Sequence, residues 1–153
     1  MKSNQDLEKY HDEEERKKWY KDEKASLLKY CSNKQLDMHR IMDKFSLALL
    51  PYFSLWAVEN RKTHEKLWVI TGELPHDHTS FQIAEDARSA IRHFFMSWNL
   101  KAENMERTLN EMASVLNDND QQKLDMIKQL RESADRLSEV YLDDNLWAKH
   151  LPN

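Results

Sequence analysis

The sequence predicts an α+β fold that is mostly helical, with a central antiparallel β-hairpin packed against an N-terminal helix and a long C-terminal helical hairpin. Among 153 residues Gly72 is the only glycine, so few tight turns and long elements are expected. Apolar residues recur at helical spacing through most of the second half of the chain. The only strand-like pattern lies between Pro51 and His78.

The first helix is predicted from about residue 4 to residue 31. Acid-before-base pairs such as Glu13 with Lys17 support it, although its apolar face is patchy and its first half should fray or reach outward. A second, short helix is predicted over Asp37–Leu50, and it must end before Pro51 because proline disfavours helical geometry in the preceding residue.

The hairpin is predicted from about residue 52 to residue 72. Tyr52–Glu59 and Leu67–Thr71 are rich in aromatic and β-branched residues, and the charged run Asn60–Lys66 between them has the length of a hairpin loop.

The helical hairpin is predicted from about residue 80 to residue 142. Thr79–Gln82 fits a capping box, which predicts a helix start there. The following apolar stripe runs in threes and fours from Ala84 to Leu116, and a second stripe runs from Leu124 to Tyr141. We expect an antiparallel pair, followed by a tail docked through Leu146, Trp147 and Leu151.

Length, charge and cysteine content favour one cytoplasmic domain spanning residues 1–153. Cys31 is the only cysteine and cannot form an internal disulfide, and the first residues lack the apolar core of a secretory signal. The longest uncharged run, Phe45–Val58, is shorter than the roughly 18 apolar residues of a membrane span. The net charge of −4 makes nucleic acid an unlikely partner.

Motifs for catalysis are missing from the sequence. Phosphate-binding and dinucleotide-binding loops need several glycines, and Ser89 with His93 lacks an orienting third group and an oxyanion hole. Cys31 is best interpreted as a small packed residue. These observations favour a non-enzymatic protein without a cofactor.

One loop offers an alternative function. Glu73, His76, Asp77 and His78 could ligate a metal, as in a metal-binding protein or metal-dependent enzyme. The preferred interpretation is structural: Asp77 and Thr79 compete to cap the following helix while the histidines face water.

The hairpin is apolar on both pleat faces. A lone two-stranded sheet is marginal, so a second face or an edge should meet a helix of the chain, a second copy or a protein partner. An internal three-layer core is about as well supported as an interface. For an interface, the expected anchors are Tyr52, Trp56, Arg61 and Trp68, because large aromatics and arginine dominate interface energies.

The strings Leu67–His78, Pro51–Trp56 and Ala87–Phe94, with Trp98, resemble an uncharacterised family of small bacterial proteins, a domain of unknown function with a W-V-I-T/S-G-D/E-L-P-x-D-H core. The resemblance covers about Trp19 to Trp147. It implies a bacterial cytosolic origin and an accessory or regulatory role, and it supplies no catalytic residue.

The sequence therefore predicts a small cytoplasmic protein-interaction module. It could be a self-associating regulator acting as a homodimer, or an inhibitor such as the immunity partner of a toxin. The metal-dependent function on the His76–His78 loop is the competing hypothesis, and a nucleic-acid accessory role is a weaker third.

Overall fold

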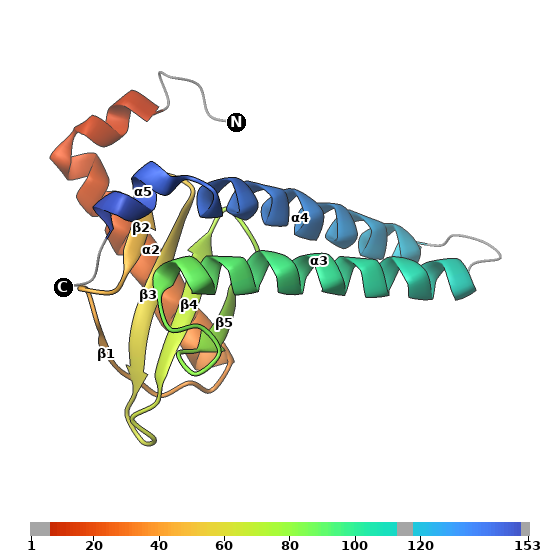
Figure 1. The fold of residues 1–153 in the computed structure, drawn as a ribbon, viewed down its shortest axis with the longest axis horizontal. Helices are drawn as coiled ribbons and strands as arrows, with labels where there is room; N and C mark the ends of the chain where they lie inside the picture. The colour runs from red at the N-terminus through yellow and green to blue at the C-terminus, as the bar shows by residue number, and fades with distance from the viewer. Residues whose placement is uncertain (1–6, 113–117, 151–153) are drawn as a thin grey trace. The chain divides into compact units, whose positions relative to one another are not determined.

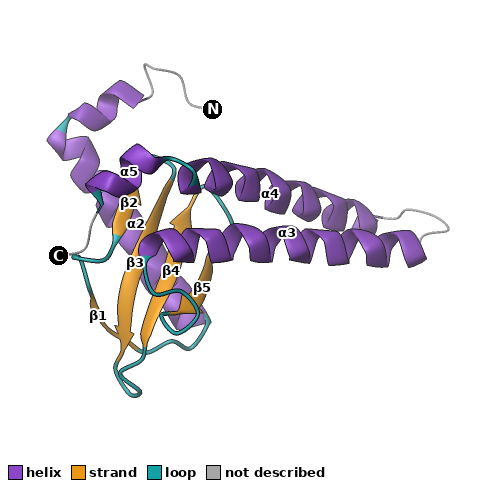
Figure 2. Ribbon diagram, in the orientation of Figure 1, coloured by secondary structure: helices purple, strands orange, loops and turns teal. Residues whose placement is uncertain are grey.

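The computed structural model describes residues 7–112 and 118–150, and it confirms the α+β fold class (Figures 1 and 2). The chain forms two compact units; the first ends at Ile83 and the second begins at Ala84. The first unit contains the 3₁₀ turn η1 (Lys9–His11), α2 (Glu13–Asn33), β1 (Met38–Ile41), β2 (Leu47–Leu49), β3 (Phe53–Asn60), β4 (Lys66–Gly72) and β5 (Asp77–Ser80). The second contains α3 (Ala87–Met112), α4 (Asp118–Tyr141) and α5 (Asp144–Lys149).

The N-terminal helix is confirmed in α2, which begins after Asp12 rather than at residue 4. The Asp12 carboxylate accepts a hydrogen bond of 3.0 Å from the Glu14 backbone N–H and so caps the helix. Residues 4–6 of the predicted range lie outside the described residues. The buried end of α2 packs on one face of the sheet, in a cluster made by Leu27, Tyr30, Cys31, Trp56, Val58, Leu67 and Val69.

The predicted hairpin is confirmed as β3 and β4, which pair antiparallel from Phe53 opposite Gly72 to Glu59 opposite Lys66. It forms the centre of a larger antiparallel sheet of order β1-β3-β4-β5, in which β2 also pairs with β3 (Figure 2). The two central strands are buried along nearly their whole length. Alternation of side chains therefore gives apolar residues on both faces, as the sequence predicts.

Gly72 ends β4 with a positive φ angle that residues with a side chain rarely adopt. Its φ is +136°, and a Cβ at this position would lie 2.4 Å from the Tyr52 carbonyl oxygen and 2.6 Å from the Phe53 Cα. Both neighbours are backbone atoms, so they cannot move aside without breaking the strand pairing. The only glycine in the chain thus permits the close approach of β4 to the start of β3.

The predicted short helix over Asp37–Leu50 is wrong. This stretch instead forms β1, a turn and β2, and both strands pair with β3. Helical spacing of a few apolar residues is a weak signal over so short a segment. Backbone hydrogen bonding to β3 outweighs this weak helical signal, so the segment forms strands.

The predicted helix start at Thr79 is also wrong. Asp77–Ser80 is β5, which pairs with β4, and Thr79 is buried opposite Trp68. The helix begins at Ala87 instead, where the Asp86 carboxylate accepts a hydrogen bond of 2.7 Å from the Ser89 backbone N–H.

The second unit confirms the helical hairpin, since α3 and α4 pack side by side along their length (Figure 1). Helix α3 continues without a break through Asn99. The buried residues of α3, including Trp98, Ala102 and Leu109, belong to the predicted apolar stripe. Leu116 at the end of the first stripe, and Leu151 in the tail, lie outside the described residues.

The tail docks through α5, as expected. Trp147 is buried, and its indole N–H donates a hydrogen bond of 3.0 Å to the Val140 carbonyl at the end of α4. Arg88 on α3 strengthens the same corner by donating to the Tyr141 carbonyl at 3.0 Å and to the Asp144 carboxylate at 2.8 Å.

Candidate functional site

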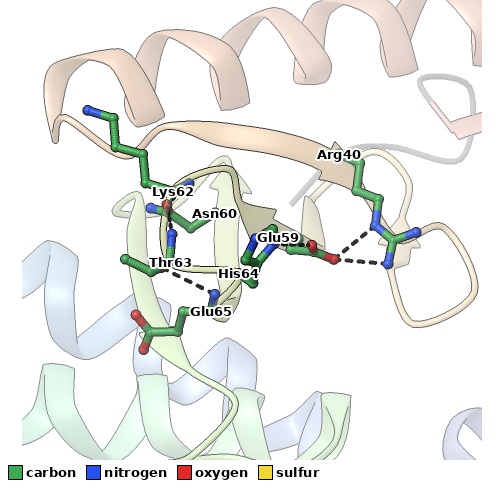
Figure 3. A network of polar contacts seen from close by, with 7 residues as sticks. All are labelled: Arg40, Glu59, Asn60, Lys62, Thr63, His64 and Glu65. Carbon is green, nitrogen blue, oxygen red and sulfur yellow. Dashed lines mark hydrogen bonds and ion pairs between the residues drawn. The ribbon is translucent and has the colours of Figure 1, made fainter.

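The β3–β4 loop is exposed and internally ordered (Figure 3). The Asn60 side-chain oxygen accepts hydrogen bonds from the backbone N–H groups of Lys62 at 2.9 Å and Thr63 at 3.1 Å. The Thr63 hydroxyl accepts from the Glu65 N–H at 3.2 Å, and the Asn60 N–H donates to the Glu65 carbonyl at 2.8 Å. His64 completes the turn with a φ of +59°. These hydrogen bonds restrain the backbone of the loop.

At the root of this loop, Glu59 joins two strands (Figure 3). Its carboxylate lies 3.0 Å from Arg40 Nε and 2.9 Å from Arg40 Nη2, and His64 Nδ1 lies 3.3 Å from its other oxygen. The hydrogen bonds from His64 and then Arg40 hold the pKa of Glu59 below its ordinary value. Sequence analysis missed this pairing, because Arg40 and Glu59 come together only through the β1–β3 register.

Arg61 is the predicted anchor that the structure leaves at the surface, with its side chain 61% exposed. Its backbone N–H donates to the Asp37 carbonyl at 2.7 Å, and its Nε lies 3.4 Å from the Asp37 carboxylate. These contacts fix the backbone at Arg61 while the guanidinium remains accessible.

The other predicted anchors lie elsewhere in the sheet. Trp56 and Trp68 are 2% and 1% exposed. Trp56 packs in the α2 cluster, and Trp68 stacks on Phe81 with ring centroids 4.3 Å apart. Tyr52 is half-buried and precedes β3 at the end opposite Arg61, about 30 Å away along an extended strand. The four residues therefore do not form one surface patch.

The loop that carries the metal alternative packs against α2. The Tyr30 hydroxyl and His78 Nδ1 are 2.7 Å apart, and the rings of both His76 and His78 lie edge-on to the Tyr30 ring. His78 is half-buried, so the expectation that both histidines face water is wrong for it. Burial, followed by the charge of Asp77, raises the pKa of Tyr30.

Within residues 7–112 and 118–150, no group of three or more His, Cys, Asp or Glu side chains is placed to hold a metal ion. Metal binding by Glu73, His76, Asp77 and His78 stays a prediction. No sequence signal could have announced the contact of Tyr30 with His78, because 48 residues separate them.

Cys31 is buried beside Tyr30, as the sequence predicts. Burial raises the pKa of its thiol, so the nucleophilic thiolate is disfavoured.

A family model described as "Domain of unknown function (DUF4826)" matches residues 13–147. The chain belongs to this family. The match to DUF4826 runs from the start of α2 to Trp147 and includes every candidate residue named above. No curated protein and no solved structure matches the chain.

Across the described part of this DUF4826 chain, no helix combines the length and apolar character needed to cross a membrane.

Proposed function

We propose that this protein is a small cytoplasmic interaction module that binds an acidic surface of a partner protein through its β3–β4 loop. The observation that carries the proposal is a loop whose backbone is fixed by its own hydrogen bonds while its basic side chains are exposed. A preordered loop loses little conformational entropy when it binds, so more of the contact energy appears as affinity.

Charge indicates the kind of partner. Arg61, Lys62 and Lys66 are exposed in the segment 61–66, and Glu65 is the acidic residue of that segment. Of the neighbouring carboxylates, Glu59 is paired with Arg40, and Asp37 lies 3.4 Å from Arg61. This local excess of positive charge stands in a chain whose net charge is −4. A partner that presents carboxylates would be attracted to the loop and oriented by it.

The predicted anchors divide their roles under this proposal. Arg61 contacts the partner. Trp56 and Trp68 stabilise the sheet that carries the loop, since neither side chain reaches the surface. A bacterial inhibitor or immunity-type protein belongs to the same functional class. Self-association is the alternative arrangement of the same module.

Native mass spectrometry of the untagged protein, taken gently from its own cells, tests the proposal first. A discrete complex with a second, different protein is expected. A homodimer would support self-association in place of binding to a different protein. A monomer that carries one metal ion would instead support the function based on His76 and His78.

Charge reversal then tests the loop itself. With the purified partner, Arg61→Glu should weaken binding about tenfold or more, because it removes a charge-assisted contact and adds repulsion. Lys21→Glu, an equal change at an exposed position of α2, should leave affinity unchanged. A folded Arg61→Glu protein that binds as tightly as the wild type would contradict the proposal.

A further inference from the structure

The edge of the sheet is interrupted between β1 and β2. Both strands pair with β3, and the residues between them leave the edge as a turn. The Met42 N–H still donates to the Ala57 carbonyl at 2.7 Å, but the Ala57 N–H finds the Ser46 hydroxyl at 2.9 Å instead of a backbone carbonyl. Side-chain replacement of a ladder hydrogen bond opens the sheet at this point. Irregularities at sheet edges are common next to binding sites.

A cavity of about 130 Å³ lies at this interruption, between the turn, β2, β3 and the middle of α2. The residues that shape it include Tyr20 from α2, Asp43 from the turn, Ala48 from β2, and Ser54 and Trp56 from β3. All belong to the sheet unit. A cavity of about 150 Å³ accepts benzene, so this one has room for a ligand of about four to six non-hydrogen atoms.

The inner part of the cavity contains an unpaired polar group. Ser54 is 2% exposed, and its hydroxyl has no hydrogen-bond partner among the described residues. It lies two residues before Trp56, so the two side chains project from the same sheet face. Ala48 stands opposite Ser54 in the register and contributes only a methyl group. A buried hydroxyl without a partner costs free energy unless something in the cavity satisfies it.

The outer part of the cavity is acidic and aromatic. Asp43 is exposed and carries the only full charge among the described lining residues. Burial, followed by the neighbouring Asp43 carboxylate, raises the pKa of the Tyr20 hydroxyl. The Tyr20 ring is tilted against the Trp56 ring, with centroids 5.3 Å apart. A carboxylate beside aromatic rings attracts an organic cation and disfavours an anion.

We propose that this cavity binds a small organic ammonium ion that also carries a hydroxyl group, such as a short amino alcohol. The ammonium group pairs with Asp43 beside the rings of Tyr20 and Trp56. The ligand's hydroxyl reaches inward to Ser54 and satisfies its orphan hydroxyl. The proposal is independent of the β3–β4 loop, since none of its residues belongs to that loop.

Titration with ethanolamine tests the proposal on the full-length protein. The indole N–H signal of Trp56 in the ¹⁵N NMR spectrum, identified by its loss in Trp56→Phe, should shift and saturate. The thermal unfolding midpoint should rise with ligand concentration, because the ligand binds only the native state. Acetate, a similar-sized anion, should produce neither effect.

Three variants separate the contacts. Asp43→Asn should weaken ethanolamine binding about tenfold, and Ser54→Ala about fivefold, as expected for a charged and a neutral hydrogen bond. Ala48→Leu should abolish binding by filling the space opposite Ser54. Asp22→Asn, which removes a carboxylate from an exposed position of α2, should bind like the wild type.

Several outcomes would overturn the proposal. Ethanolamine could leave the Trp56 signal and the unfolding midpoint unchanged, or acetate could act as strongly as ethanolamine. Equal affinity in Asp43→Asn would also exclude it. Crystals soaked in ethanolamine that contain only ordered water beside Ser54 would identify the cavity as a hydration site.

Discussion

The sheet unit and the helical unit use buried polar groups differently. Beneath α2, the Trp56 indole N–H donates to the Thr71 hydroxyl at 3.0 Å, and that hydroxyl donates to the Glu23 carboxylate at 2.8 Å. The α3–α4 pair is instead held by an apolar seam that includes Ile127, Leu130, Ala134 and Leu137. Among the described residues of α3 and α4, Ser133 is the buried polar residue.

This difference favours binding sites in the sheet unit. A helical pair brings together residues spaced along two faces, which suits uniform apolar packing. A sheet under a helix brings together groups from remote positions, such as Tyr20, Asp43 and Ser54 around the cavity. We therefore expect the binding properties to reside in the sheet unit, while the helical unit contributes chiefly stability.

The largest expected effect comes from the sheet core. Trp68→Ala should lower the free energy of unfolding by about 3–5 kcal/mol, because it removes a fully buried indole and its stacking on Phe81. Urea unfolding followed by circular dichroism measures the change. Trp68→Phe keeps a ring opposite Phe81 and should lose much less. A loss below about 1 kcal/mol in Trp68→Ala would contradict a central role of Trp68 in the core of the sheet unit.

The apolar seam of the helical unit should be nearly as sensitive. Leu137 is fully buried, and Leu137→Ala should cost about 2–5 kcal/mol of unfolding free energy through the cavity it leaves. Leu142, close by in sequence, is 71% exposed, so Leu142→Ala should change stability by less than about 0.5 kcal/mol. Similar costs for the two leucines in urea unfolding would contradict the seam.

Within the sheet unit, buried hydroxyls with and without a hydrogen-bond partner should respond differently to removal. Thr71→Val removes the acceptor of the Trp56 N–H while preserving shape, and should cost about 1–3 kcal/mol because that donor is left buried and unpaired. Ser54→Ala, on the same sheet face, removes a hydroxyl without a protein partner and should be neutral or stabilising. Chemical denaturation of the two variants side by side tests the contrast, and equal costs would refute it.

The smallest effect should appear only in alkaline solution. The pKa of Tyr30 is raised, so its neutral form is favoured in the folded state. The resulting stability is fully present below the ordinary tyrosine pKa, about 10, and is lost as the pH rises through the folded value. Tyr30→Phe should flatten this decline in unfolding free energy between neutral and alkaline pH. Parallel pH profiles for the two proteins would show that Tyr30 does not contribute.

The helices could be predicted because their signal is local. The stripes that define α3 and α4 repeat over many turns, so single mismatches do not obscure them. The strands β1, β2 and β5 contain only three or four residues each, too few to establish a period. Their structure depends on pairing with β3 and β4, which the sequence of the segments themselves does not encode.

The same reasoning applies to the sites. The exposure of Arg61 follows from the charged run between two strong strand patterns. The burial of Trp56 and Trp68 could not be decided, because both faces of the hairpin are apolar and either could have met solvent or a partner. The proposed ligand site depends on the Ser54 hydroxyl, which has no hydrogen-bond partner among the described residues. The absence of a partner cannot be predicted from the sequence.

Gly72 has a consequence for how this sequence can vary. Every replacement adds at least a Cβ, and that atom would collide with the backbone of Tyr52 and Phe53. These backbone atoms cannot shift without breaking the strand pairing. In a complete substitution library selected for folded protein, Gly72 should stand out as a position that admits no alternative.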